Sequence, residues 1–169
     1  MIGDDQHLVL VGLMGSGKST VARVVAERLG RPLVDSDAVI EERTGRTVRE
    51  IFLADGEPAF RELETAALLD ALADPRPSVI AAAGGAVLAE CNRQALRSST
   101  ARVVWLCADP ATLLERVRGA SHRPLLDDDA EAGLRTMSER REPLYREVAD
   151  AIVLVDGRSV SEVVDAVLR

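Results

Sequence analysis

The 169-residue chain is short of several residue types, and each shortage excludes a class of protein. Its two cysteines, Cys91 and Cys107, are too few and too far apart for a disulfide framework or a zinc site, so we expect a reduced, cytoplasmic protein. No apolar run approaches the ~18 residues of a membrane span, and the acidic start does not resemble a signal peptide. The net charge of −7 disfavours nucleic acid as a partner.

Lysine is almost absent. Of the 21 basic residues only Lys18 is a lysine, and the rest are arginines. A chain that uses arginine nearly everywhere and keeps one lysine indicates that a guanidinium does not replace the ammonium at position 18. Aromatic residues are also scarce, at 2% of the chain.

Hydrophobic periodicity predicts strands that alternate with helices. We expect strands at 7–12, 31–35, 78–82, 101–107 and 151–155. We expect helices at 19–30, 37–44, 47–54, 57–73, 110–117, in the segment that ends near 148, and from 159 to the last residue. Since the strands are apolar on both faces, the pattern predicts one three-layer α/β domain with a parallel sheet.

Two segments depart from this alternation. Residues 35–63 contain helices with no strand between them, which indicates an insertion on the core domain. Residues 118–131 lack periodicity and are rich in charge and helix breakers, so we expect a mobile loop. In the helix that follows, we expect Pro143 to interrupt the helical segment.

The stretch GLMGSGKS at 12–19 matches the phosphate-binding pattern GxxxxGK[ST]. It lies between a predicted strand and a predicted helix, as a P-loop requires. Glycines let backbone N–H groups wrap a phosphate chain, and the helix N-terminus adds partial positive charge. Lys18 reaches the β- and γ-phosphates, and the hydroxyl of Ser19 binds Mg²⁺. The alternative, a glycine-rich turn with an exposed lysine, is disfavoured by this context.

Several classes of P-loop protein lack their signatures here. The Asn-Lys-x-Asp motif of GTPases is absent, since Lys18 is the only lysine. The HRD and DFG motifs of protein kinases are absent as well. The length leaves little room for a motor or a transporter. A small kinase that phosphorylates a small molecule remains.

Two aspartates follow the second predicted strand, in LVDSDAVI at 33–40. Residues i and i+2 of an extended chain point to the same side, so the two carboxylates share a region that needs a cation. Asp35 ends the strand at the sheet edge where open α/β sheets bind ligands, and it can serve the Mg²⁺ beside Ser19. Asp37 can face the acceptor hydroxyl. The alternative for Asp37 is that it only caps the next helix.

Arginines recur near these elements. Arg61 and Glu64 lie at i, i+3 on one helix face, where the glutamate can hold the guanidinium. Arg123 lies in the expected loop, and Arg141 lies beside Pro143. In a chain this rich in arginine, the alternative for each of them is a solvated surface residue.

Six motifs occur together over nearly the whole chain: GLMGSGKST, VDSD, DGEPAFRELE, GGAV, RPLL and REPLYREVAD. In this order and spacing they resemble shikimate kinase. The resemblance implies the nucleoside monophosphate kinase-like P-loop fold, with five parallel strands in the order 2-3-1-4-5 and a lid loop at 118–131. It implies transfer of the γ-phosphate of ATP to the 3-hydroxyl of shikimate, on the route to chorismate and the aromatic amino acids.

The resemblance also implies the site residues. For ATP they are Gly15, Ser16, Gly17, Lys18, Ser19 and Thr20 at the phosphates, Arg158 on one side of the adenine, either Arg116 or Arg118 on its other side, and Arg123 in the lid. For shikimate they are Asp37, Phe52, Phe60, Arg61, Gly84, Gly85 and Arg141. For Mg²⁺ they are Ser19 and Asp35. The residues implied to act in catalysis are Lys18, Asp37 and Arg123.

The chain departs from the family at one place. Three glycines are usual where this chain has Ala83, Gly84 and Gly85. If position 83 needs a positive φ, alanine is strained there by ~1 kcal/mol or more; if φ is negative, alanine adds only a methyl group to the pocket wall.

Three other functions remain open at this point. A gluconate kinase would keep the P-loop without needing RPLL or paired arginines. A nucleoside monophosphate kinase would want aromatic or base-reading groups, which are scarce. A nucleotide-binding module without turnover would be expected to lose Lys18, Asp37 or Arg123, and all three are present. We expect a monomer whose partners are shikimate and ATP, with neither nucleic acid nor membrane.

Overall fold

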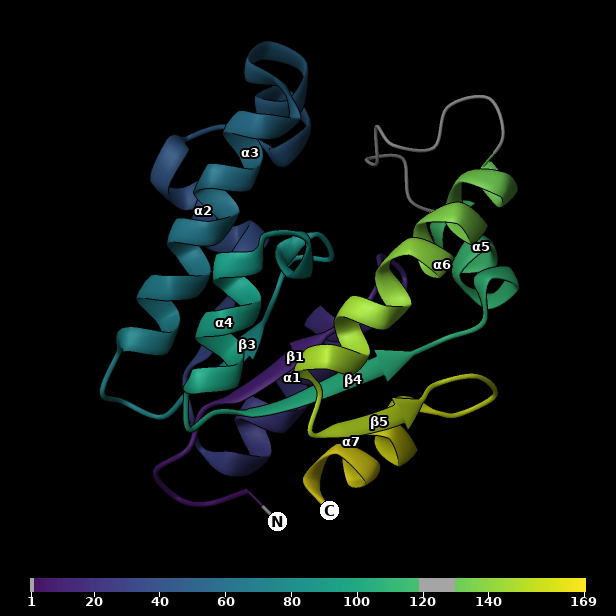
Figure 1. Cartoon of the computed structure of the whole chain (residues 1–169). Coiled ribbons are helices and arrows are strands. Elements are labelled where there is room, and N and C mark those ends of the chain that lie inside the picture. The colour runs from purple at the N-terminus through teal and green to yellow at the C-terminus, as the bar shows by residue number, and fades with distance from the viewer. Residues whose placement is uncertain (1, 119–129) are drawn as a thin grey trace.

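The computed structural model describes residues 2–118 and 130–169, and its centre is a parallel sheet of five strands (Figure 1). The strands are β1 (Leu8–Val11), β2 (Leu33–Asp35), β3 (Val79–Ala81), β4 (Arg102–Cys107) and β5 (Ala151–Leu154). They lie in the order β2-β3-β1-β4-β5, all pairs parallel, which confirms the predicted sheet. Each predicted strand is present, shortened by one or two residues.

Helices follow the strands as predicted, with two additions. They are α1 (Lys18–Leu29), α2 (Ser36–Thr44), α3 (Val48–Ala73), α4 (Glu90–Ser98), α5 (Pro110–Arg118), α6 (Ala130–Val148) and α7 (Val160–Leu168). The additional elements are the short 3-10 helix η1 (Ala86–Leu88) and α4, which the sequence analysis did not assign. The ends of the segment predicted as a loop, 118 and 130–131, are helical, and the rest of it lies outside the described residues.

Alternate side chains of the strands feed two separate cores, one on each face of the sheet. On one face, Val9 and Val11 of β1 pack in a cluster with residues of α3, α4, α5 and α6. On the other, Leu8 and Leu10 pack in a cluster with α1 and α7. All four side chains are at most 1% exposed. The domain therefore has three layers, as predicted.

A smaller core holds α2 against α3 beyond the sheet. Ile40 and Ile51 are buried with Phe60 and Ala67, and Phe52 packs against them. Figure 1 shows this pair of helices and the pair α5–α6 rising on opposite sides of the molecule. The predicted insertion at 35–63 corresponds to α2 and the first part of α3.

A glycine divides α3 where the sequence predicts two helices. Gly56 has φ 83° and ψ 172°, a conformation that only glycine adopts without strain. The helical path resumes at Glu57 and Pro58, where proline is tolerated because the first turn needs no N–H donor. The first part begins at a capping box made by Thr47 and Glu50, as predicted.

The expectation that Pro143 interrupts its helix is wrong. Helix α6 runs through it to Val148. A mid-helix proline removes one backbone hydrogen bond, but tertiary packing compensates for the loss: Leu134, Tyr145 and Val148 are buried against the sheet core.

No helix in the two described ranges is both long and apolar enough to cross a membrane.

Candidate functional site

The P-loop leads from β1 into α1 and has the backbone that its glycines allow. Gly12, Gly15 and Gly17 have φ values of 147°, 80° and 91°. Gly17 is the N-cap of α1, so no side chain occupies the first N–H groups of the helix. The ammonium of Lys18 donates to the carbonyl oxygens of Gly12 and Leu13 at 2.8 and 3.0 Å. The loop therefore presents backbone donors and one cation at the carboxyl end of the sheet, a suitable site for phosphates.

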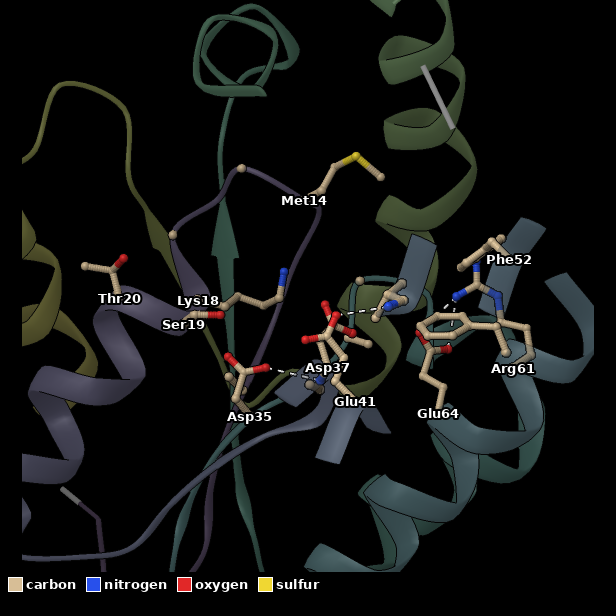
Figure 2. A pocket seen from close by; sticks show the side chains of 18 residues that line it. Met14, Lys18, Ser19, Thr20, Asp35, Asp37, Glu41, Phe52, Arg61 and Glu64 are labelled. Atoms are coloured by element: carbon tan, nitrogen blue, oxygen red, sulfur yellow. Dashed lines mark hydrogen bonds and ion pairs between the residues drawn. The ribbon is translucent and has the colours of Figure 1, made fainter. Parts of the chain in front are cut away.

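A cavity of about 400 Å³ opens beside this loop and extends to α2 and α3. Figure 2 shows Lys18 and Ser19 on one side of it, Phe52 and Arg61 on the other, and Asp37 between them. The full lining is Met14, Gly15, Gly17, Lys18, Ser19, Thr20, Asp35, Asp37, Glu41, Val48, Phe52, Phe60, Arg61, Glu64, Ala81, Ala82, Ala83 and Gly84. The phosphate residues and the acceptor residues that the sequence predicts thus meet in one cavity.

Asp35 and Asp37 differ in their contacts, which the sequence alone left open. Asp35 is the N-cap of α2, and its Oδ1 accepts from the backbone N–H groups of Asp37 and Ala38 at 3.1 and 3.5 Å. The alternative reading, in which Asp37 caps this helix, is wrong. Both carboxylates line the cavity, with Asp35 nearer Ser19 and Asp37 nearer the α3 side (Figure 2).

Arg61 lies between two carboxylates of its own helix. Its Nε and Nη2 donate to Oε1 of Glu57 at 3.1 and 2.7 Å, and its Nη1 donates to both oxygens of Glu64 at 2.9 and 3.1 Å. Glu64 is 2% exposed and Glu57 is 49% exposed. The rings of Phe52 and Phe60 have centroids 6.0 and 5.6 Å from the guanidinium carbon. The cation is thus held on three sides.

These contacts shift the pKa values of the pair. Burial alone would lower the pKa of the Arg61 guanidinium, but Glu64 and Glu57 raise it above its usual value. Burial raises the pKa of Glu64 against the opposing effect of Arg61, and the negative charge of Asp37 adds to the rise. The fixed positive charge at Arg61 suits an anionic ligand.

The turn after β3 is positioned by buried donors. The carbonyl of Gly84 accepts from Nη1 of Arg141 at 3.1 Å and from the hydroxyl of Tyr145 at 2.6 Å. Arg141 is 6% exposed and Tyr145 is 1% exposed, and burial raises the pKa of that phenol. A Cβ on Gly85 would overlap the guanidinium of Arg61, so this turn must be glycine for Arg61 to lie where it does.

A second cavity, of about 300 Å³, lies on the other side of the P-loop. Arg116 of α5 and Arg158 of the β5–α7 connection line it together with apolar side chains such as Val155 and Val163. Arg116 also donates to the carbonyl oxygen of Gly15 at 3.2 Å. Two guanidinium groups and several valine side chains can bind a flat ring whose attached phosphate chain lies on the P-loop.

Most predicted site residues come together in these two cavities. Ser16 lines only the second cavity, and Gly85 and Arg141 lie directly behind the wall of the first. Arg118 is the last residue of α5, with its side chain outside the described residues, and Arg123 lies outside them altogether.

Sequence reasoning missed three residues of the site. Glu41 lines the first cavity and accepts from the N–H of Val48 at 2.9 Å. Glu57 and Tyr145 contact Arg61 and Gly84 from outside it. Glu57 was open to prediction, since it stands four residues before Arg61 on the same helix face; the other two contacts depend on the tertiary fold.

Comparison with known proteins gives a consistent result. The sequence model of the shikimate kinase family matches residues 14–169. Shikimate kinase of Symbiobacterium thermophilum is 47% identical over 166 residues, covering 96% of this chain and 94% of that protein. Shikimate kinase of Rhodococcus erythropolis is 43% identical, with coverages of 92% and 91%. The structure of shikimate kinase from Acinetobacter baumannii in complex with shikimate superposes with a TM-score of 0.92 at 37% identity, covering 96% of this chain and 90% of that one.

A gluconokinase from Sinorhizobium meliloti has the same fold at a TM-score of 0.61 and 22% identity, over 99% of this chain and 91% of that one. At this identity the likeness concerns the fold alone.

Proposed function

The chain belongs to the shikimate kinase family and transfers the γ-phosphoryl group of ATP to the 3-hydroxyl of shikimate, and from this premise we propose which residues carry the reaction. The product, 3-phosphoshikimate, lies on the route to chorismate and the aromatic amino acids. The observation that carries the proposal is the one cavity in which the P-loop faces a partly buried arginine, held by carboxylates, across Asp37.

Shikimate binds on the α2–α3 side of the cavity in this proposal. Its carboxylate is gripped by Arg61 and Arg141, because the guanidinium group matches a carboxylate and both cations are held in place, Arg61 by the buried Glu64 and Arg141 by the carbonyl of Gly84. Phe52 and Phe60 pack against the ring, and Gly84 and Gly85 let the backbone approach it. This orientation turns the hydroxyl groups toward Asp37.

ATP binds across the P-loop in this proposal. The phosphates lie on the loop from Gly15 to Thr20, and the adenine occupies the second cavity between Arg116 and Arg158. Arg118 and Arg123 belong to the ATP side by family resemblance. On binding, Lys18 exchanges its present carbonyl partners for phosphate oxygens.

The residues present fit a magnesium ion held mainly by substrate and water. The hydroxyl of Ser19 and the carboxylate of Asp35 line one cavity, and both are the hard oxygen donors that Mg²⁺ prefers. Residues 2–118 and 130–169 contain no cluster of three or more metal-binding side chains, which suits an ion that keeps its waters and binds phosphates. The helix contacts of Asp35 use Oδ1, so Oδ2 would be the oxygen offered to the ion or to one of its waters. When bound, the ion neutralises charge on the β- and γ-phosphates.

Catalysis then consists mainly of positioning and charge neutralisation. Asp37 orients the 3-hydroxyl and accepts its proton. Lys18 and Arg123 face the charge on the transferring phosphoryl group. Ala83 adds a methyl group to the cavity wall beside this centre.

A coupled assay of ADP release tests the assignment of the acceptor. We expect turnover with shikimate, and none above background with gluconate or a nucleoside monophosphate. Turnover with gluconate at a comparable kcat/KM would overturn it. We further propose that the enzyme is cytoplasmic and monomeric. Sedimentation of the purified protein, with and without ligands, tests the oligomeric state.

A further inference from the structure

Glu57 is the one direct partner of Arg61 that stands outside the cavity. It is not among the residues that line the cavity in the described part of the chain, and its side chain is 49% exposed. It still makes two of the four hydrogen bonds of the guanidinium, both to its Oε1 atom. An exposed ion pair of this spacing is usually a minor element of helix stability.

The contact between Glu57 and Arg61 also restricts the orientation of the guanidinium. Glu64 holds Arg61 through a single nitrogen, Nη1, and one nitrogen leaves the guanidinium plane free to turn. Glu57 holds the Nε–Nη2 edge, so the two carboxylates together fix both the position and the plane. The guanidinium has five N–H groups, and these four bonds leave one of them, on Nη2, for a ligand carboxylate.

We propose that Glu57 is a positioning residue for shikimate, which orients the guanidinium of Arg61 toward the substrate carboxylate without touching the substrate. The inference rests on the proposed role of Arg61. Freezing a long side chain in the free enzyme removes an ordering cost from substrate binding, on the order of threefold to tenfold in affinity.

Glu57 could in principle weaken the binding of shikimate instead of strengthening it. Glu57 and the substrate are both anions, so Glu57 could compete for Arg61 and weaken binding. Two observations argue against this: Glu57 does not line the cavity in the described part of the chain, and its half-exposed charge is screened by solvent. The two readings predict shifts of the shikimate KM in opposite directions.

The chain contains a matched control. In α6, Nε and Nη2 of Arg146 donate to Oε1 of Glu142 at 3.1 and 2.8 Å, with the same i, i+4 spacing. Glu142 is 46% exposed, close to the value for Glu57. The two pairs differ in that only Arg61 lines the substrate cavity.

Steady-state kinetics of Glu57→Ala, Glu57→Gln and Glu142→Ala, with Arg61→Lys beside them, test the inference. We expect Glu57→Ala to raise the KM for shikimate about threefold to tenfold, with kcat and the KM for ATP unchanged. Glu57→Gln keeps an acceptor oxygen for both N–H groups and should stay within about twofold of the wild type. Glu142→Ala should leave all constants unchanged.

A partly unfolded variant would lose kcat at constant KM, which separates instability from mispositioning. An unchanged or lowered KM in Glu57→Ala overturns the inference, and so does an equal rise in Glu142→Ala. If Arg61→Lys itself leaves the KM for shikimate unchanged, the proposed role of Arg61 fails, and the inference fails with it.

Discussion

At the scale of single residues, the reaction depends on which groups share the cavity with the P-loop. Asp37 lies in the cavity between the P-loop and Arg61. It does not cap α2, because Asp35 is the N-cap of that helix. The two carboxylates, two residues apart, therefore have different environments, since only Asp35 caps the helix.

In the proposed mechanism, replacement of Asp37 by asparagine removes the proton acceptor and keeps the shape of the side chain. Since a positioned general base contributes about 10²–10⁴-fold to rate, we expect kcat to fall within that range. The affinity for ATP, measured by calorimetry, should stay the same. A variant with near-normal kcat would remove Asp37 from the chemistry.

Substitution of Gly85 tests whether Arg61 needs the space beside this glycine in order to bind shikimate. Its φ is −93°, so alanine can adopt the backbone, but the new Cβ would overlap the guanidinium. We expect Gly85→Ala to raise the KM for shikimate by roughly tenfold or more, as the loss of one charge-assisted contact implies.

Gly84→Ala is the comparison for this change, because Gly84 also lines the cavity but a Cβ on it would not meet Arg61. A Cβ there would lie 3.4 Å from the carbonyl oxygen of Gly12 and 3.5 Å from the N of Met14, which are tolerable contacts. If the two alanine variants raise the KM equally, the space beside Arg61 is not the reason for the glycine.

At the scale of elements, α3 carries most of the acceptor side and is divided by one glycine. Gly56 separates the turn of Phe52 from the turn of Phe60 and Arg61, so the break sets how the two parts face each other. Their rings lie 4.6 Å apart between centroids.

Gly56→Ala should cost about 1–3 kcal/mol of unfolding free energy, because its φ and ψ suit glycine alone. It should also raise the KM for shikimate. Gly30→Ala, at a left-handed helix C-cap far from the cavity lining, should cost about 1–2 kcal/mol and leave the KM unchanged. Urea unfolding with parallel kinetics measures both, and an unaffected KM in Gly56→Ala would contradict the role of the break.

The sequence predicted the sheet and the P-loop because their signals are local: apolar runs, glycines and capping boxes. It did not predict α4, whose N-cap, Ala89, makes no side-chain hydrogen bond and so leaves no start signal. It misread Pro143, where burial of Tyr145 and its neighbours outweighs a local helix breaker. The contact of Tyr145 with Gly84 joins segments 61 residues apart, and no periodicity carries such information.

At the scale of the whole molecule, a buried carboxylate makes stability depend on pH. Burial raises the pKa of Glu64 above its value in the unfolded chain. The folded state then binds the proton more tightly, so the contribution of Glu64 is fully present below the unfolded pKa and is lost as pH rises through the folded pKa.

We therefore expect the stability of the wild type relative to Glu64→Gln to decrease as pH rises from about 4.5, the usual pKa of this group, toward neutrality. Glu162 gives the opposite sign. Its hydrogen bonds with Ser159 lower its pKa, so its contribution is present above the unfolded pKa and is lost as pH falls through the folded pKa. Thermal melts of both glutamine variants, from well below pH 4.5 to neutrality, measure the two trends, and parallel trends would contradict the assignment.

The single lysine has a practical consequence. Lys18 carries the only side-chain amine of the chain, and its Nζ lies against the carbonyl oxygens of the P-loop. An amine-selective acylating reagent therefore has one side-chain target, and that target is the nucleotide site itself. The extent of labelling at this residue would report the fraction of molecules whose P-loop is shielded by nucleotide. A lysine-specific protease can cut the chain only after this residue, so the extent of cleavage would report the same fraction.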